Sequence, residues 1–405
     1  MDPRKLIRFR YLPEILFTVL AVPVLFLNLG VWTVQLWDES RVITSSYEMY
    51  RDGLALIPTF QGGSDIHRTL PPLLVWLQAL CMHLFGPTEF AARFPSALSG
   101  VLMGWLLISW SRHSIGNGWI GFLAGMLAIC SAGLNGFHAL HGADYEGMMI
   151  FFMLLQLRTF HGYVESNTSE HRFRWFGGFT LAVALGVLTK GPQALFFFPA
   201  FGVYWLLRKG WRQESVILLL SRIGLLILAM SWYYVVRELL EPGYLHWVWM
   251  NDLGGRYASA IDAAGYYPQF YWEVLQDQLH GLIYLIPATL LLIFVRKEWR
   301  QRGILLMLIA VLLYAVIIQS ASTKHEWYLL PIIPLLFYLA VSGCYSLAQF
   351  LDKRLRMTRG RIRVITLWIL SVIGGWFWLI RADERMQETA IRPEHNDYYS
   401  VTQWF

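Results

Sequence analysis

Charged residues are scarce in this chain. Only 15% of its 405 residues are charged, whereas 56% are hydrophobic and 16% are aromatic. Soluble domains carry about 25% charged residues, so the composition excludes an ordinary water-soluble domain. Apolar runs of about 20 residues recur along the whole chain, which is typical of proteins that cross the membrane many times. The sequence therefore predicts an all-α polytopic membrane protein.

Cysteine is also scarce, and other common landmarks are missing. Cys81, Cys130 and Cys344 all lie in apolar segments, and their spacing predicts neither a disulfide framework nor a metal site. No internal repeat, low-complexity tract or separate soluble domain stands out. Any chemistry must therefore depend on the few polar residues between the apolar runs.

The distribution of basic residues predicts the topology. The net charge of +6 does not indicate nucleic-acid binding, because the Lys and Arg residues concentrate in a basic leader and in short loops near 208–209, 296–302 and 353–363. Such loops face the cytoplasm. We expect an integral membrane protein, with its N-terminus in the cytoplasm and its C-terminus on the outer face. The first apolar run is too long for a signal-peptide core and is expected to remain as an anchor.

About eleven transmembrane helices fit the apolar runs. They are expected at 13–34, 93–111, 119–135, 146–164, 175–189, 191–207, 216–236, 278–295, 303–320, 327–350 and 364–380. The short apolar segment 70–85 and the segment 40–52 are expected to form two interfacial helices in the first outer loop, 36–92. We expect a membrane module at 1–240, a long outer loop with further spans at 241–380, and a short outer tail at 381–405.

Carboxylates at two places in the sequence fall on the expected outer face. Asp38 and Glu39 follow the first apolar run, and Asp144 lies between the third and fourth runs. Acids at such positions can simply begin a loop or favour a helix dipole. The functional alternative is that such acids deprotonate a hydroxyl group.

Cations fall on the same face, where the positive-inside pattern disfavours them. They are Lys190 in the turn 188–192, Lys324 before the tenth run, and Arg256 in the long loop. Lys190 can be a snorkelling anchor, and Arg256 can pair with Asp252. The alternative is that they bind a phosphate, whose negative charge rises as it leaves. The aromatic residues nearby fit both sugar stacking and a membrane belt.

The order of these motifs resembles the protein-mannosyltransferase-like glycosyltransferases of the GT-C superfamily, which include the lipid A aminoarabinose transferase. The matching pieces are 38–41, 71–76, 85–96, Asp144, 188–192, 251–256 and 323–331. The resemblance implies the GT-C fold and an enzyme that transfers a sugar, with inversion, from a polyprenyl-phosphate donor to a lipid, glycan or protein acceptor. It implies a catalytic role for Asp38 and donor-phosphate contacts for Lys190, Lys324 and Arg256. For this reaction we expect Asp38 to be the base, with Glu39 or Asp144 in support. His141, Asn251, His325 and Tyr328 are the candidate substrate-binding residues.

The chain departs from these relatives before its paired prolines. Many relatives have an acid and a Lys where this chain has Thr69 and Leu70, and Arg68 is the candidate replacement for that Lys. No cofactor or metal is required by the sequence, although Asp144 and His141 offer possible metal ligands. Two other classes stay open: a lipid or sugar transporter or flippase, which tends to show repeated halves and midplane charges, and a non-catalytic membrane subunit.

Overall fold

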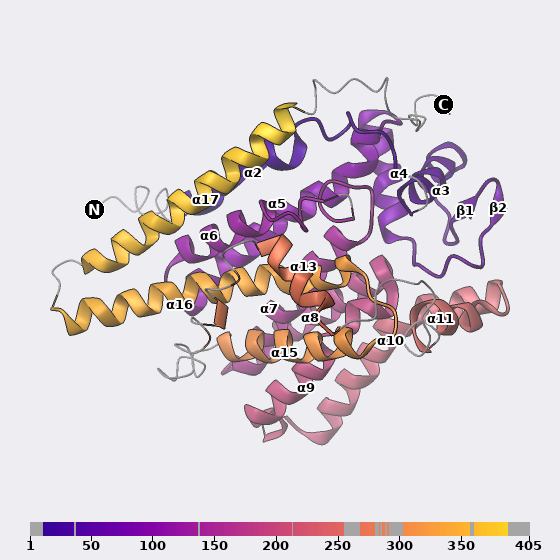
Figure 1. Ribbon diagram of the computed structural model, residues 1–405. Coiled ribbons are helices and arrows are strands. Elements are labelled where there is room, and N and C mark those ends of the chain that lie inside the picture. Colours follow the sequence, from indigo (N-terminus) through magenta and orange to yellow (C-terminus); the bar gives the residue numbers. More distant parts are fainter. Residues whose placement is uncertain are drawn as a thin grey trace, which may run out of the picture.

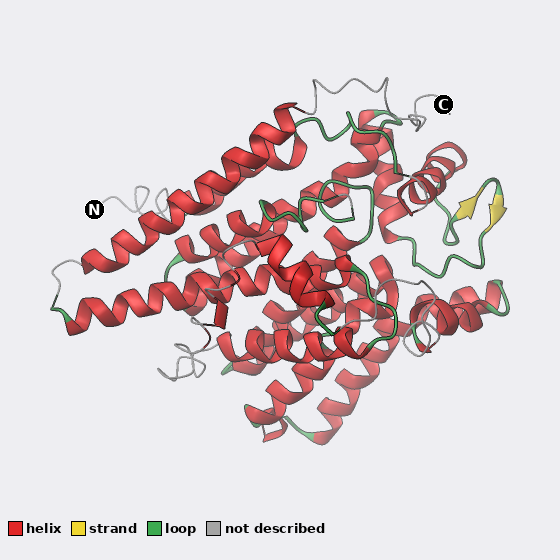
Figure 2. Ribbon diagram, viewed as in Figure 1, coloured by secondary structure: helices red, strands yellow, loops and turns green. Residues whose placement is uncertain are grey.

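The computed structural model describes residues 11–35, 38–136, 138–212, 214–254, 268–279, 283, 286–287, 290, 303–356 and 360–387. Figure 1 shows long helices that run alongside one another, with α3, α4 and a small hairpin gathered at one end. Helices dominate the described residues (Figure 2). The hairpin is the short antiparallel pair β1 (Thr59–Phe60) and β2 (Gly63–Ser64). The all-α prediction is therefore confirmed.

The helices are as follows. The first half contains α2 (Leu12–Phe26), α3 (Asp38–Asp52), α4 (Leu73–Phe85), α5 (Glu89–Ser114), α6 (Gly118–Ile129), α7 (Glu146–Glu165), α8 (Ser169–Lys190) and the 3₁₀ helix η1 (Gly191–Leu195). The second half contains α9 (Phe198–Leu207), η2 (Gly210–Arg212), α10 (Val216–Leu240), α11 (Tyr244–Asp252), α13 (Phe270–Leu279), α15 (Ile304–Ser320), η5 (Glu326–Ile332), α16 (Ile333–Arg354) and α17 (Arg361–Gln387).

Several of these helices have the length and composition of membrane spans. Within the described residues they are α5, α10, the continuous η5–α16 segment and α17, with a further bent pair in which α8–η1 meets α9 at 81°. The apolar windows of α10 and α17 are only 11% buried inside the protein. Helices that expose apolar side chains on most of their surface are stable only against lipid. The chain is therefore an integral membrane protein.

Most expected spans coincide with helices, but the first one is shorter than predicted. Helix α2 ends at Phe26, and the chain reaches Gln35 without helix through Asn28, which has a positive φ of 57°. The apolar composition of residues 27–34 suggested a continuous helix, whereas this left-handed residue breaks it. The expected span 278–295 lies largely outside the described residues.

Two ion pairs mark the ends of α7. Lys190, at the end of α8, pairs with Glu146 at the start of α7. Arg208, after α9, pairs with Glu165 at the far end of α7, with an Nε–Oε1 distance of 2.6 Å. Because α7 has 20 residues, it is about 30 Å long, close to the thickness of the hydrocarbon core. The chain therefore returns along the length of α7 between Lys190 and Arg208.

Tight packing joins the N-terminal helix to this bundle. A Cβ atom at Gly104 of α5 would lie 2.0 Å from Cζ of Phe17, so only glycine allows α2 to approach α5 this closely. Phe17 itself is fully buried. Arg112, in the last turn of α5, pairs with Glu14, in the first turn of α2, at 2.6 Å. This ion pair is a second contact between the two helices.

Helices α3 and α4 are present where the two interfacial helices were predicted. Helix α4 has 13 residues and is therefore about 20 Å long, short of the roughly 30 Å needed to cross a bilayer. Its Gln78 is fully buried, accepts a hydrogen bond from Ser46 of α3 at 2.6 Å and donates one to the carbonyl of Ala143 at 3.3 Å. These bonds hold both helices against the loop that carries Asp144.

Candidate active site

A buried ion pair fixes the position of Asp38. The Glu39 carboxylate accepts hydrogen bonds from Arg93 Nε of α5 at 2.8 Å and from the backbone N–H of Ala143 at 2.9 Å. Arg93 is fully buried and also donates to the carbonyls of Leu29 and Trp32. Glu39 thereby ties the start of α3 to α5 and to the 130–145 loop. Its neighbour Asp38, the first residue of α3, remains exposed.

This arrangement separates the roles of the two adjacent acids. Both Glu39 oxygens already accept strong hydrogen bonds, since the second one accepts from the Gln35 N–H at 2.8 Å and from Arg93 Nη2 at 3.1 Å. These contacts favour a positioning role for Glu39. The prediction that Asp38, Glu39 and Asp144 are catalytic, with Asp38 as the base and Glu39 or Asp144 in support, stays a prediction.

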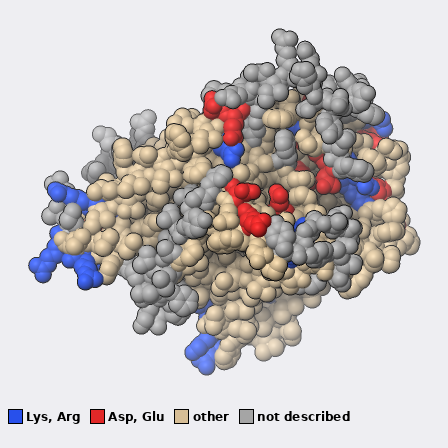
Figure 3. All heavy atoms as spheres, viewed as in Figure 1, with Lys and Arg blue, Asp and Glu red and all other residues tan. Residues whose placement is uncertain are grey.

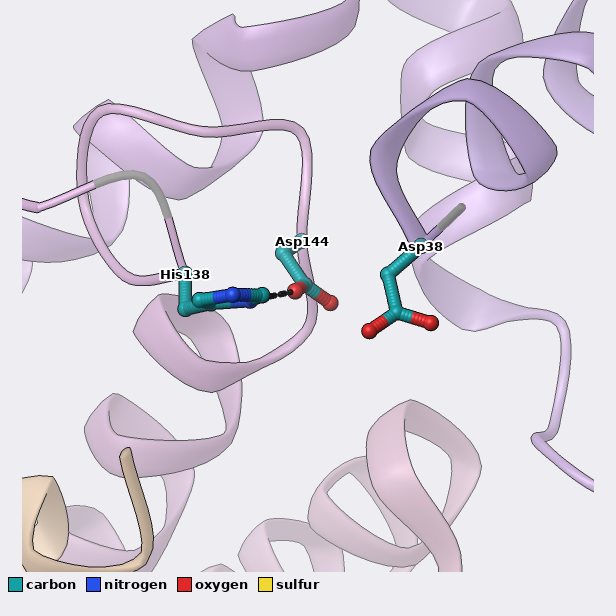
Figure 4. A group of neighbouring side chains, drawn as sticks. All are labelled: Asp38, His138 and Asp144. Atoms are coloured by element: carbon teal, nitrogen blue, oxygen red, sulfur yellow. Dashed lines mark hydrogen bonds and ion pairs between the residues drawn. The ribbon is translucent and has the colours of Figure 1, made fainter. Parts of the chain in front are cut away.

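Asp144 faces Asp38 across a small gap, with His138 on its other side (Figure 4). One Asp144 oxygen accepts from the backbone N–H of Tyr145 at 2.7 Å, and the other lies 2.9 Å from His138 Nδ1. The Asp144 side chain is 9% exposed. Two acids and an imidazole are therefore held together by α3 and by the loop between α6 and α7.

His138 was missed by reasoning from the sequence. It lies in the same loop as Asp144, between α6 and α7, but a lone His beside a Phe gives no periodic or spacing signal. His141, which was proposed instead as a substrate-binding residue, is 1% exposed within this loop. The loop geometry brings His138 rather than His141 to the two carboxylates.

The interaction between His138 and Asp144 shifts the pKa values of both groups. The hydrogen bond to Asp144 raises the pKa of His138 above its usual value, against the opposing effect of burial. Burial acts to raise the pKa of Asp144, but the His138 hydrogen bond and the charge of Lys190 outweigh it and lower that pKa. Both shifts favour an imidazolium–carboxylate ion pair near neutral pH. Asp144 is thus held as an anion beside Asp38.

Three cations line a cavity of about 540 Å³ that reaches these carboxylates. Arg41 pairs with Asp65, with an Nε–Oδ2 distance of 2.9 Å, and Lys190 pairs with Glu146. Arg68 is 8% exposed and donates to the Tyr145 hydroxyl at 2.7 Å. Arg68 therefore places a guanidinium in the cavity beside Leu70, which stands where many relatives have Lys.

The other predicted residues divide into two groups. Asn251, His325 and Tyr328 line the same cavity, and Asn251 also donates to the carbonyl of His67 at 3.1 Å. Lys324 is directed to the C-terminal end of α15 instead, where its Nζ donates to the carbonyls of Gln319 and Ala321 at 2.6 and 3.1 Å. Arg256 lies outside the described residues.

The cation-lined cavity lies between two others. A largely apolar cavity of about 280 Å³, bordered by α15 residues such as Tyr314 and Ile318, shares Glu146 and Tyr328 with it. A third cavity, of about 300 Å³, shares Asp38, His138 and Asp144 with it. The two carboxylates therefore lie where the cation-lined cavity meets the third one. The Trp327 side chain borders all three cavities.

The side chains of Asp38, His138 and Asp144 have the chemistry of metal ligands. One ligand atom each from Asp38, His138 and Asp144 lie within 4.8 Å of one another. Carboxylate and imidazole groups suit several divalent cations. His138 Nδ1 is, however, already within hydrogen-bond distance of Asp144, and an imidazolium there supplies positive charge to the same carboxylate.

Comparisons with known proteins show which sequences and folds this chain resembles. A sequence model of the dolichyl-phosphate-mannose-protein mannosyltransferase family matches residues 69–234. An undecaprenyl phosphate-α-4-amino-4-deoxy-L-arabinose arabinosyl transferase of Yersinia enterocolitica is 26% identical over 84% of this chain and 62% of its own length. The corresponding protein of Aeromonas salmonicida is 27% identical, with the same shares. The chain thus spans about three fifths of the length of these relatives.

Solved structures show the same fold. ArnT from Cupriavidus metallidurans bound to undecaprenyl phosphate superposes with a TM-score of 0.76 and 17% identity, covering 94% of this chain and 78% of that one. The archaeal oligosaccharyltransferase AglB from Archaeoglobus fulgidus, in complex with an inhibitory peptide and a dolichol-phosphate, gives a TM-score of 0.57 with 11% identity, covering 94% and 56%. This chain therefore has the GT-C fold, and it is similar in sequence and structure to the aminoarabinose-transferase-like membrane glycosyltransferases.

Proposed function

We propose that this protein transfers a sugar from a polyprenyl-phosphate donor to an acceptor hydroxyl or amine. The observation that carries the proposal is the order of the cavities. An apolar cavity suits a lipid chain, the cation-lined cavity beside it suits a phosphate, and Asp38 and Asp144 lie at the far border of the cation-lined cavity. This is the order in which a lipid tail, its phosphate and the reacting sugar carbon follow one another in such a donor.

In the proposed mechanism Asp38 is the base. It removes the acceptor proton as the acceptor attacks the anomeric carbon, the bond from that carbon to the phosphate oxygen breaks, and polyprenyl phosphate leaves with inversion. Arg68 and Lys190 stabilise the negative charge on the leaving phosphate, and Arg41 borders the same cavity. Asp144, kept ionised by His138 and Lys190, orients the acceptor.

No metal ion is required in this mechanism. Protonated His138 supplies beside Asp144 the positive charge that a divalent cation would supply, and the leaving phosphate is bound by side-chain cations. We expect activity to survive dialysis against EDTA. Loss of activity on chelation, restored by one divalent cation, would instead assign Asp38, His138 and Asp144 as metal ligands.

The proposed setting is the bacterial inner membrane, with the three cavities on the periplasmic side. Several basic side chains gather at the end where α16 meets α17, and others lie at the lower edge and on the right of the view, whereas acidic side chains border a hollow near its middle (Figure 3). Positive residues favour the cytoplasmic side. A transporter would be better served by charges near the middle of the helices, whereas Glu146 and Lys190 lie at helix ends.

A transfer assay tests this function. Membranes that contain the wild type or the Asp38→Asn variant are incubated with a panel of labelled undecaprenyl-phosphate sugars. General base catalysis contributes about 10²–10⁴-fold, so Asp38→Asn should lower the rate of sugar transfer by that factor at an unchanged protein level. Asp52→Asn, at the exposed opposite end of the same helix, is the matched control and should keep the wild-type rate. Equal rates for wild type and Asp38→Asn would refute the assignment of the base.

A further inference from the structure

The third cavity carries a charge pattern that distinguishes between acceptors. The carboxylates of Asp38, Glu39, Asp144 and Glu326 all border this cavity of about 300 Å³, which we call the acid chamber. Of the described residues that line it, none is Lys or Arg. The neighbouring cavity, by contrast, is lined by Arg41, Arg68 and Lys190. The two cavities that meet at Asp38 therefore differ in the charge of their lining residues.

Pairing within the protein offsets only half of this negative charge. Arg93 neutralises Glu39, and His138 is paired with Asp144. Asp38 and Glu326 are both exposed and both line the acid chamber, and within the described chain no Lys or Arg forms an ion pair with either. An anion in the acid chamber would therefore meet two uncompensated carboxylates. Unit charges about 4 Å apart interact strongly at a protein surface, and here the interaction would be repulsive.

The hydrogen-bonding groups point to the same ligand chemistry. The Oε1 atom of Gln278, from α13, is buried and has no hydrogen-bond partner among the described residues, and Gln278 lines the acid chamber. The residue as a whole is 8% exposed. An amide oxygen and two carboxylates are all acceptors, so they need a ligand that donates. Hydroxyl and ammonium groups donate, whereas a phosphate dianion does not.

We propose that the acid chamber binds the acceptor and that the acceptor presents a hydroxyl or a protonated amine, without a phosphate at its reacting end. The inference rests on the proposed transfer function and specifies the acceptor of that same site. The attacking O–H or N–H loses its proton to Asp38, its heteroatom forms the new bond to the sugar carbon, and polyprenyl phosphate departs toward the cations. Four residues border both the acid chamber and the cation-lined cavity: Asp38, His138, Asp144 and Trp327. They would then separate a side that rejects phosphate from a side that binds it.

Three small probes test this charge preference directly. They are methyl glucoside, methyl glucosaminide and methyl glucoside 6-phosphate, which present a neutral, a cationic and an anionic form of one sugar. Their equilibrium binding to the full-length protein in lipid nanodiscs is measured at pH 6 in low salt, with and without undecaprenyl phosphate. We expect the amine to bind at least about tenfold more tightly than the phosphate, which corresponds to about 1.4 kcal/mol. The neutral sugar should fall between them.

Glu326 supplies the variant, because it borders the acid chamber and has no part in the proposed proton transfer. Glu326→Gln should narrow the difference between the amine and the phosphate, and Glu326→Lys should abolish or invert it. Glu170→Lys, a charge reversal at an exposed site on the first turn of α8, should leave the preference unchanged. Raised salt should weaken the preference through screening.

Two results would overturn the inference. One is phosphate binding as tight as that of the amine in the wild type, and the other is an amine preference that Glu326→Lys leaves intact. The binding of undecaprenyl phosphate, measured in the same nanodiscs, tests the transfer function separately. If this lipid binds and the probes show no charge preference, only the acceptor inference fails. If the lipid does not bind at all, the proposed function and the inference fail together.

Discussion

The buried ion pair between Glu39 and Arg93 permits a quantitative test of how the site is positioned. The Arg93 side chain is fully buried and that of Glu39 is 5% exposed, so neither charge is stabilised by bulk water. Replacing Arg93 by Met leaves the Glu39 carboxylate buried without its partner, which typically costs about 3–5 kcal/mol. It also removes the donor to the Leu29 and Trp32 carbonyls. We expect a loss of unfolding free energy at the upper end of that range.

A double-mutant cycle separates the pair from its surroundings. Replacing Glu39 by Gln together with Arg93 by Met removes both charges, so the double variant should be more stable than the sum of the single losses predicts. Reversible unfolding in mixed SDS micelles, followed by tryptophan fluorescence, gives the free energies. Arg174→Met in α8 is the control, because Arg174 and Glu170 form an ion pair in which both side chains are about 70% exposed. Exposed pairs contribute about 0–1 kcal/mol.

The same variants link stability to catalysis. Glu39 holds the first turn of α3, and therefore Asp38, against the 130–145 loop. The double variant should regain stability but keep a reduced transfer rate, because the ion pair that ties the start of α3 to α5 is still absent. An Arg93→Met protein that unfolds within about 0.5 kcal/mol of the wild type would refute this reasoning, since that is the range of an ordinary surface substitution.

Three further predictions follow from the site. Arg68→Ala should weaken undecaprenyl phosphate binding by roughly tenfold or more, as expected for the loss of one charged hydrogen bond. Arg68→Lys should recover part of this affinity. An unchanged affinity of Arg68→Ala in a binding assay with labelled lipid would contradict a phosphate contact. The raised pKa of His138 means that its stabilising contact is complete below its unfolded pKa and is lost as the pH rises through the folded value. The gap in melting temperature between wild type and His138→Asn should therefore be larger at pH 6 than at pH 9, and an equal gap at both would show that the pair does not titrate. Lys324→Gln should lower the melting temperature by loosening the end of α15 while leaving the Michaelis constant for the donor unchanged, and a selective rise in that constant would restore Lys324 as a donor contact.

Sequence reasoning found the polar residues of the site because a charge beside a long apolar run is conspicuous. Asp38, Asp144, Arg68 and Lys190 all stand at helix ends or in loops, and all line the cation-lined cavity. The helices themselves follow from apolar runs long enough to cross a membrane. What the run length alone could not show is the early end of α2 at Phe26, because a single left-handed residue at Asn28 stops it.

Other features depend on contacts between residues that are distant in sequence. Glu39 is paired with Arg93 of another helix, so its likeness to Asp38 in the sequence gave no sign that its oxygens are occupied. Lys324 is diverted by the carbonyls of Gln319 and Ala321, a local bond that depends on how α15 ends. His138 became recognisable only when the loop had brought its ring to Asp144.

Trp327 gives the three cavities a shared wall, and this has a consequence for how substrates bind. Its indole ring borders the apolar cavity, the cation-lined cavity and the acid chamber, and its centroid lies 4.3 Å from those of both His138 and His325. A movement of this ring that enlarges one cavity changes the shape of the other two. If binding in one cavity moves the ring, it alters affinity in another, and such coupling is reciprocal. An acceptor that tightens the hold on the lipid donor must itself be held more tightly, by the same factor, when the donor is present.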